Sequence, residues 1–407
     1  MQKSRLRKYA RLIARKGVQV QKGQDVFVTA GLEQPEFVAM VTQELYKAGA
    51  RKIFVKFNYP QLEKYHVRHR SIKALSTVEP FEEAEAQYKA DHLCARLALV
   101  TADPDALKGV NIPKMMKGQK ARMAITRPYS EQSDGKCQWS VAAVPGRAWA
   151  KKVFPNVRAG KAVEMLWEAI LSAARVDDDP VAAWEAHNAD IVSRCRYLTG
   201  LNIDELEYHA SNGTSLRIGL IEGAIFCGGG ESTDKGVYYH PNIPTEECFT
   251  TPHRERVDGI LYSTKPLVYQ GQVIDNFFLR FEKGQIVEAH AGVNDEMLQQ
   301  MIARDEGSAY LGECALVPFD SPINQTGLLF YNTLFDENAC CHMAIGRGYT
   351  SAVPACKGRT KEEIRALGVN QSGIHVDFMI GTADLSVIAH CRDGKSVEIF
   401  RDGTWAF

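Results

Sequence analysis

Hydrophobic and polar positions in the first part of the chain alternate between two patterns. Short β-rich runs at 25–30, 52–57 and 96–102 predict strands, and the last of them reads as buried. The segments 35–50 and 160–176 carry apolar residues at helical spacing and predict amphipathic helices. Because such alternation is typical of a mostly parallel sheet covered by helices, we expect an α/β architecture in this part.

The pattern changes after the sequence "VDDDP", which ends at Pro180. A helix is predicted near 181–199, and short β-rich segments broken by glycine then follow one another closely. Such segments predict an antiparallel sheet or barrel-like body, with one further helix near 294–304. We therefore predict two domains, an α/β N-terminal domain over 1–180 and a β-rich α+β domain over 181–407.

Composition supports this division and narrows the class of protein. A chain of 407 residues is too long for one ordinary hydrophobic core. Lys plus Arg equals Asp plus Glu, at 49 each, so the net charge favours neither a nucleic acid nor an anionic membrane as partner. No run of 18 apolar residues is present that could span a bilayer. The basic N-terminus lacks the uninterrupted apolar stretch of a signal peptide, so we expect none.

The cysteines favour a reducing compartment. Ten are present and none forms a CxxC pair, which predicts free thiols in a cytoplasmic protein. Cys248, Cys314 and Cys341 each adjoin an acidic residue or a histidine and could be proposed as zinc thiolates. We favour small buried side chains on the strand face opposite those neighbours, because thiolate sites more often show CxxC or CxxH spacing.

Acidic residues and histidines recur in the second half of the chain. "NIPTEECFTTPHRERVDG" (242–259) is polar enough for a surface loop, yet it lies between strand-like segments and contains adjacent glutamates. Similar residues follow in "YLGECALVPF", "FDENACCHMAIGRGY" and "GIHVDFMIG". The residues in question are Glu246, Glu247, Glu313, Glu337, His342, His375 and Asp377.

His375 and Asp377 give the clearest physical signal. They are two residues apart, so on a strand both side chains point to the same face. Their neighbours Ile374, Val376 and Phe378 are apolar. Because an unpaired polar group in such surroundings is costly, the two either pair with each other and the backbone or bind a metal ion. The residues alone leave both alternatives open.

Taken together, the carboxylates and imidazoles suit two divalent ions that share a bridging carboxylate. Oxygen and nitrogen ligands without thiolate fit Zn, Co, Mn or Mg. Two such ions close together are a common hydrolytic device.

The motifs around these residues resemble the thermophilic-type metalloaminopeptidases, the family of aminopeptidases T, S and II. The similarity runs through the whole chain and is densest between 242 and 382. It implies a homodimer and two bound divalent metal ions, with zinc as the first expectation and cobalt, manganese or magnesium as alternatives. It implies that the metal ligands are Glu247, Glu313, Glu337, His342, His375 and Asp377.

The resemblance also implies roles for residues outside this set. Tyr349, in "GRGY", is expected to be catalytic and to donate a hydrogen bond to a developing oxyanion. Glu246 is expected either to support the metal ligands without touching the ions or to serve as an acid–base group. Its side chain should point away from that of Glu247, its neighbour on an extended chain. His253 is expected to support its loop or touch substrate, and His240 to be structural.

The implied activity is that of a dinuclear aminopeptidase. It would hydrolyse the N-terminal bond of peptides that have a free α-amine, through a hydroxide bridging the two metal ions. Two other functions stay open from the ligands alone. One is another metallohydrolase, an amidase or deacylase, on the same scaffold; the other is a metal-stabilised binding protein without turnover.

Overall fold

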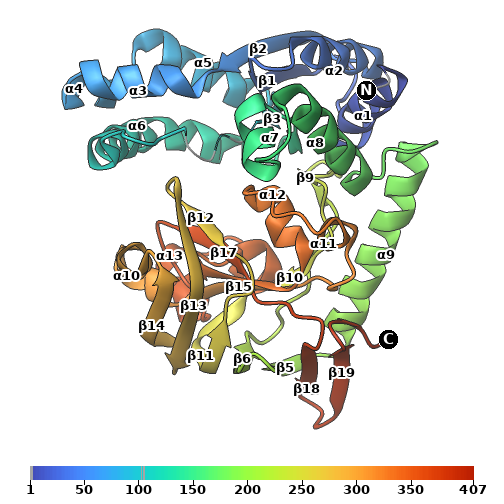
Figure 1. Cartoon of the computed structure of the whole chain (residues 1–407), viewed down its shortest axis with the longest axis vertical. Helices are drawn as coiled ribbons and strands as arrows, with labels where there is room; N and C mark the ends of the chain where they lie inside the picture. The colour runs from blue at the N-terminus through green and yellow to red at the C-terminus, as the bar shows by residue number, and fades with distance from the viewer. Residues whose placement is uncertain (1–2, 102, 104–105) are drawn as a thin grey trace. The chain divides into compact units, whose positions relative to one another are not determined.

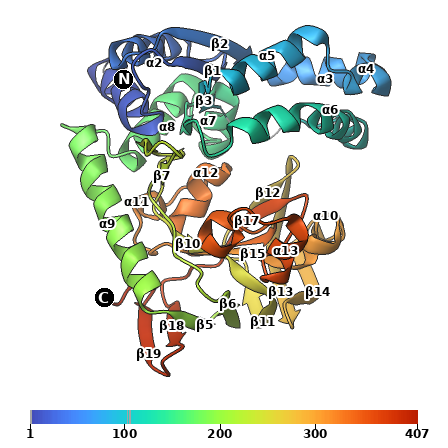
Figure 2. The ribbon, with the colours of Figure 1, turned by 180° about the vertical axis from the view of Figure 1, so that it is seen from behind.

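The computed structural model describes residues 3–101, 103 and 106–407, drawn in two views in Figures 1 and 2. Within these residues the chain forms two compact units, each built from two separate stretches of chain. The first unit contains the chain up to Glu185 and then Gly230–Pro244, and the second contains Ala186–Gly229 and Thr245–Phe407.

The chain first leaves the first unit within helix α9 (Pro180–Gly200), close to the predicted domain boundary. The return of Gly230–Pro244 was not predicted. Only one very short strand of this segment, β9 (Asn242–Ile243), joins the sheet of the first unit. The division into an α/β domain at 1–180 and a β-rich domain at 181–407 stays a prediction.

A five-stranded sheet forms the centre of the first unit, in the order β2-β1-β3-β4-β9. All of its neighbouring strands are parallel, so the predicted α/β architecture is confirmed. On one side of the sheet, the rings of Tyr9, Phe37 and Trp167 pack together with centroids 5.0 to 6.4 Å apart. The first four strands are β1 (Asp25–Gly31), β2 (Lys52–Asn58), β3 (Ala95–Val100) and β4 (Trp139–Ala143).

Helix α2 (Pro35–Ala48) shows how local sequence sets the ends of an element. Pro35 occupies its first turn, where the missing N–H costs nothing. Gly49 ends the helix with a left-handed φ of 117°, which glycine adopts without the strain a side chain would bring. The helix begins at the first residue of the predicted segment 35–50 and ends two residues before the last.

The other helices of the first unit surround the sheet or extend from it. In both views α3 to α6 project together from one end of the sheet (Figures 1 and 2). These helices are α1 (Lys3–Leu12), α3 (Pro60–His69), α4 (Ile72–Ser76), α5 (Pro80–Asp91), α6 (Ile112–Ser133), α7 (Arg147–Val153) and α8 (Ala159–Ala173). The paired strands β7 (Glu231–Ser232) and β8 (Tyr238–Tyr239) also belong to this unit.

Two antiparallel sheets build the second unit, as the glycine-broken β pattern predicts. The larger, nine-stranded sheet supplies most of the hydrophobic core, including Leu206, Ile218 and Val387. Its strands are β5 (Ile203–His209), β6 (Ser215–Leu220), β11 (Pro252–Tyr262), β12 (Leu267–Tyr269), β13 (Gln272–Glu282), β14 (Gln285–Val293), β18 (Ser386–Cys391), β19 (Ser396–Arg401) and β20 (Thr404–Trp405).

The smaller sheet has four strands in the order β10-β15-β16-β17. Strands β10, β15 and β17 lie together in both views, although they come from well-separated parts of the sequence (Figures 1 and 2). The four strands are β10 (Cys248–Thr250), β15 (Leu311–Leu316), β16 (His342–Gly346) and β17 (His375–Met379). Each of them contains or directly follows a residue predicted to bind metal.

Short helices connect these strands. Helix α10 matches the helix predicted near 294–304. Among the described residues, no helix combines the length and apolar character needed to cross a bilayer. The remaining helices of the second unit are α10 (Asp295–Ile302), α11 (Pro322–Gln325), α12 (Thr333–Asp336) and α13 (Lys361–Ala366), with 3-10 turns at Glu306–Ala309, Glu337–Ala339, Thr350–Ala352 and Pro354–Cys356.

Candidate metal centre

Strand β17 places His375 and Asp377 side by side. Both side chains project from the same face of the strand, as their spacing predicts, and His375 Nε2 lies 3.1 Å from Asp377 Oδ1. The other ring nitrogen, Nδ1, donates to the backbone carbonyl of Arg347 at 2.7 Å. Because that bond fixes the ring, His375 presents Nε2 to the carboxylates.

Strand β15 brings a second carboxylate to the same nitrogen. Glu313 Oε2 lies 3.0 Å from His375 Nε2, and the glutamate side chain is only 4% exposed. The next residue, Cys314, faces the hydrophobic core, as strand alternation requires. Adjacent residues of β15 therefore lie on opposite faces of the strand, one acidic and one apolar.

The start of β16 supplies the other imidazole. His342 Nε2 lies 3.2 Å from Glu247 Oε2, and the histidine side chain is 1% exposed. Its Nδ1 donates to the Cys340 carbonyl at 3.4 Å. The two histidines thus share one arrangement, in which Nδ1–H is bound to a backbone carbonyl and Nε2 faces a carboxylate. Such an outer hydrogen bond commonly fixes the ring of a metal-binding histidine.

Five of the predicted ligands fall into two groups of three. One group contains Glu247, Glu313 and His342, and the other contains Glu313, His375 and Asp377. Within each group the donor atoms lie within 4.8 Å of one another. Glu313 belongs to both groups, so its carboxylate stands between them.

Glu337 lies beside this cluster but in neither group of three. It begins the 3-10 turn after α12. Burial raises the pKa of Glu337 well above its usual value, and the negative charges of Asp377, Glu247 and Glu313 raise it further. Its role as a ligand stays a prediction.

The cluster concentrates negative charge in a buried place, and this charge raises the pKa values of both histidines. Burial lowers the pKa of His375, but its bonds to Asp377 and Glu313 outweigh that effect and raise the pKa to about 11. The pKa of His342, also lowered by burial, is raised to about 9 by Glu247 and the other carboxylates. Burial raises the pKa of Glu313 to about 7, although the bond from His375 opposes it. Positive charge at the Nε2 atoms is therefore strongly favoured.

The thiols lie outside this arrangement. All ten cysteines are free, and Cys248, Cys314 and Cys341 belong to the hydrophobic core. Burial raises the pKa of the Cys341 thiol above its usual range. The predicted role as small buried side chains is confirmed for these three.

Tyr349 lies next to the cluster. Its ring centroid is 4.7 Å from that of His375. Reciprocal bonds of 3.0 Å hold its backbone, because Tyr349 N–H donates to Thr251 Oγ1 and the Thr251 hydroxyl donates to the Tyr349 carbonyl. Burial raises the pKa of the Tyr349 phenol above its usual range, and the nearby carboxylates add to the effect. The phenol therefore keeps its proton at neutral pH.

Glu246 points away from the cluster, as the extended chain predicts. Its carboxylate lies 3.6 Å from His187 Nε2, on α9, and its backbone N–H donates to Asn338 Oδ1 at 2.7 Å. His187 and Asn338 were not predicted from the sequence. The only local signal is that Asn338 directly follows Glu337.

The two remaining histidines have structural surroundings. His253, in β11, packs against Gly368 and its Nδ1 accepts the N–H of Glu255 at 3.2 Å. His240 belongs to the first unit and packs edge-on against Trp184, with ring centroids 5.6 Å apart. The structural role expected for His240 agrees with these contacts.

The known proteins that this chain resembles are metalloproteases and aminopeptidases, which agrees with a cluster of potential metal ligands. The model of the family described as thermophilic metalloprotease (M29) matches residues 2–405. Aminopeptidase 2 of Geobacillus stearothermophilus is 40% identical over 405 residues, which are 99% of this chain and 98% of the relative. Aminopeptidase AmpS of Bacillus subtilis (strain 168) is 39% identical over 406 residues, again 99% of this chain and 98% of the relative.

A solved structure extends the similarity to the fold. Wild-type AmpT from Thermus thermophilus superposes with a TM-score of 0.92 at 36% sequence identity, and the match covers 100% of both chains. The match to AmpT in sequence and fold extends over the full length of the chain, so it includes the strands that carry the carboxylates and imidazoles described above. The chain belongs to the thermophilic metalloprotease family (M29).

Proposed function

We propose that the protein is a dinuclear metal-dependent aminopeptidase. The observation that carries the proposal is the position of Glu313, which belongs to two adjacent groups of three potential ligands. A carboxylate has two oxygens, so one residue can bind an ion on each side. The names of the relatives, all aminopeptidases, support the same activity.

The residues fit divalent metal ions. Their donors are carboxylate oxygens and the Nε2 atoms of His342 and His375, each ring held through Nδ1 by a backbone carbonyl. A cation at Nε2 would take the place of the proton that the carboxylates now favour there. Oxygen and nitrogen donors without thiolate suit Zn, Co, Mn or Mg, and zinc is our first expectation. We assign Glu247, Glu313, Glu337, His342, His375 and Asp377 as the ligands.

Two bound ions would supply Lewis-acid polarisation of the scissile carbonyl and, at neutral pH, a bridging hydroxide as nucleophile. The chain's own residues do the rest. The hydroxyl of Tyr349 donates a hydrogen bond to the oxyanion that forms on the substrate carbonyl. Glu246 supports the segment that carries Glu247, or exchanges protons during the reaction.

The substrate we propose is a peptide with a free N-terminus. Release of chromophore from aminoacyl-p-nitroanilides, with and without a chelator, tests activity and metal dependence together. We expect hydrolysis that the chelator abolishes and that added divalent metal restores. Hydrolysis that survives complete metal removal would contradict the proposal.

Blocking the α-amine should then slow the reaction strongly. If a metal ion or one of its carboxylate ligands holds the α-amine, that contact positions the carbonyl as well as binding the substrate, so its loss affects the chemical step. We expect N-acetylated peptides to be cleaved at least ~10²-fold more slowly in kcat/KM, equivalent to about 2.7 kcal/mol. Rates on matched free and acetylated peptides measure this directly. Equal rates would point instead to an amidase or deacylase.

We further propose that the protein is a homodimer. Many of the exposed large apolar side chains belong to β2, at the edge of the first unit's sheet, and to the segments that follow it in the chain. Large exposed apolar areas commonly mark protein interfaces. The residues are Phe54, Val55, Phe57, Tyr59, Leu62, Tyr65, Ile72, Phe81, Met123 and Ile125.

A charged substitution in this area tests the dimer. Sedimentation equilibrium should give twice the chain mass for the unmodified protein, and Phe57→Glu should shift it toward the monomer because an interface would bury the new charge. Val287→Glu, on β14 and equally exposed (45% against 47% for Phe57), is the matched control. Identical masses for both variants and the unmodified protein would argue against this surface.

We also infer that the protein acts in the cytoplasm, and not on nucleic acids or membranes. Free thiols at all ten cysteines and the balanced charge of 49 basic and 49 acidic residues support this inference.

A further inference from the structure

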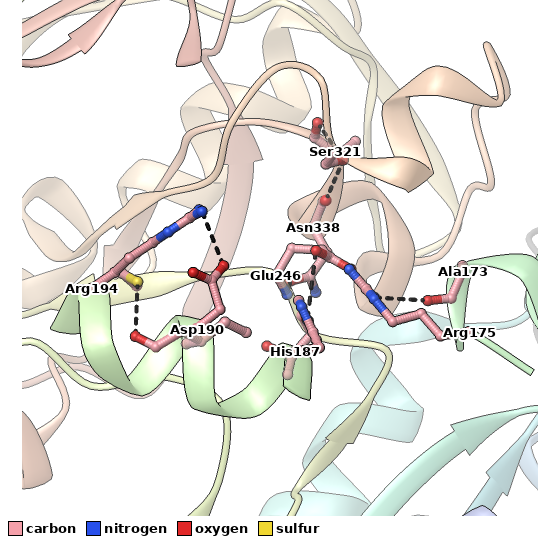
Figure 3. A network of polar contacts seen from close by, with 12 residues as sticks. Ala173, Arg175, His187, Asp190, Arg194, Glu246, Ser321 and Asn338 are labelled. Atoms are coloured by element: carbon pink, nitrogen blue, oxygen red, sulfur yellow. Dashed lines mark hydrogen bonds and ion pairs between the residues drawn. The ribbon is translucent and has the colours of Figure 1, made fainter. Parts of the chain in front are cut away.

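We propose that Asn338 is a positioning residue that fixes the spacing between the Glu246–Glu247 segment and Glu337, and that His187 holds the same segment from helix α9. The inference rests on the proposed function, since it concerns two segments assigned to bind metal. Figure 3 shows these residues at close range, with Asn338 and His187 both beside Glu246.

Asn338 is completely buried and both ends of its amide are bound. Oδ1 accepts the backbone N–H of Glu246 at 2.7 Å. Nδ2 donates to the carbonyl of Leu334 at 3.1 Å and lies 3.4 Å from Glu337 Oε1. Because a backbone N–H can only donate and a carbonyl can only accept, these partners fix the orientation of the amide.

The bonds of Asn338 join two segments that are far apart in the sequence. Glu246 immediately precedes Glu247, and Asn338 immediately follows Glu337. The amide therefore spans from the backbone next to one predicted ligand to the side chain of another. A change in its length or polarity must move one segment relative to the other or leave a buried polar group unpaired.

The turn that carries Asn338 is itself held by Ser321. The hydroxyl of Ser321 lies 3.0 and 3.1 Å from the backbone carbonyls of Asn338 and Ala339 and shares its one proton between them. Ser321 is 1% exposed, so these bonds are shielded from water. The backbone of Asn338 is consequently fixed, and its side chain can set the distance between the Glu246 segment and Glu337.

His187 fixes the other side of the Glu246 segment. Its Nε2–H donates to the carbonyl of Thr245 at 2.8 Å, and the same nitrogen lies 3.6 Å from Glu246 Oε2. The bond to a carbonyl requires a donor but no positive charge. Residues 245 and 246 are thus bound on both sides, through Thr245 to α9 and through Glu246 to Asn338.

Small displacements of such a segment have large effects on a metal site. Residues that hold ligands without touching the metal typically change metal affinity or activity by about 10- to 100-fold when replaced. We therefore expect Asn338→Asp, which keeps the shape and the acceptor but places a carboxylate against Glu337, to weaken metal binding by about 10- to 100-fold. At saturating metal, kcat should fall while KM changes by less than about 3-fold, because the ions and not the substrate contacts are displaced.

The experiment measures metal dissociation constants by equilibrium dialysis, kinetics at saturating metal, and thermal unfolding of the full-length protein. His187→Gln keeps an N–H donor near Thr245 and should preserve metal affinity, whereas His187→Phe removes the donor and should lower it. Val387→Ala, in the core of the nine-stranded sheet of the same unit, is the control for loss of stability alone. It should lower the melting temperature and leave metal affinity unchanged.

The outcomes separate this inference from the proposed function. If the unmodified protein binds no divalent metal, the proposed function fails. If it binds metal and hydrolyses aminoacyl substrates, but Asn338→Asp and His187→Phe keep its metal affinity and kcat within 2-fold, Asn338 and His187 are structural only and the inference is overturned. Should Asn338→Asp fail to fold, the His187 pair carries the same test, and equal metal affinity in both variants contradicts the inference.

Discussion

Glu313→Gln is expected to abolish hydrolysis and to lower the metal content of the protein. The substitution keeps the shape of the side chain but removes the charge that lets one carboxylate serve both groups of three. Metal ions contribute several kcal/mol of transition-state stabilisation in such sites, so the rate should fall by at least about 10³-fold. Elemental analysis of the purified variant and its rate on aminoacyl-p-nitroanilides measure the two effects.

A second buried carboxylate provides the control. Asp25, in the first unit, is 2% exposed and forms a two-pronged ion pair with Arg51 at 2.8 and 2.7 Å. Asp25→Asn also neutralises a buried carboxylate, and it should cost stability without changing metal content. Full metal occupancy in Glu313→Gln would refute the bridging assignment. Metal loss in both variants would mean that damage to the fold explains the result.

Tyr349→Phe should lower kcat by about 10²–10³-fold, equivalent to roughly 2.7–4 kcal/mol, the usual cost of losing one oxyanion donor. Phenylalanine keeps the ring that packs against Phe249 and His375 and removes only the hydroxyl. The loss should therefore appear in kcat more than in KM, because the bond strengthens as charge develops. Steady-state kinetics at saturating metal measure both constants.

Metal content and melting temperature should barely change in Tyr349→Phe. Tyr239→Phe, which removes a hydroxyl that donates to Glu231 at 2.8 Å in the first unit, is the matched control and should keep its kcat. A Tyr349→Phe variant with unchanged kcat would make Tyr349 a packing residue. Loss of metal together with activity would place the tyrosine among the ligands instead.

The regular elements of both units could be predicted because local patterns determine them. Strands β1 and β2 and helix α2 follow from apolar runs and from the residues at helix ends, Pro35 and Gly49. The side-by-side placement of His375 and Asp377 follows from the two-residue repeat of a strand. The opposed directions of Glu313 and Cys314 follow from the same repeat.

Contacts between distant segments could not be predicted in this way. Nothing in the sequence around 187 or 338 indicates that these residues meet Glu246, since the pairing depends on how α9 and the turn after α12 pack in the second unit. The same holds for Glu337, whose neighbours in space come from three other strands or loops. The local sequence pattern predicts which face of a helix or strand a side chain lies on. Which residues of other segments that side chain contacts depends on tertiary packing.

The return of Gly230–Pro244 to the first unit has a consequence for protein synthesis. Strands β1 to β4 leave the ribosome well before β9, so the outer edge of β4 must wait, unpaired, for Asn242–Ile243. An open edge of this kind favours association with other chains. A fragment that ends at residue 180 should therefore aggregate more readily than the full chain. Because only Pro244 separates β9 from Thr245, Glu246 and Glu247, the nascent chain completes its first sheet and delivers the first predicted metal ligand in one short stretch.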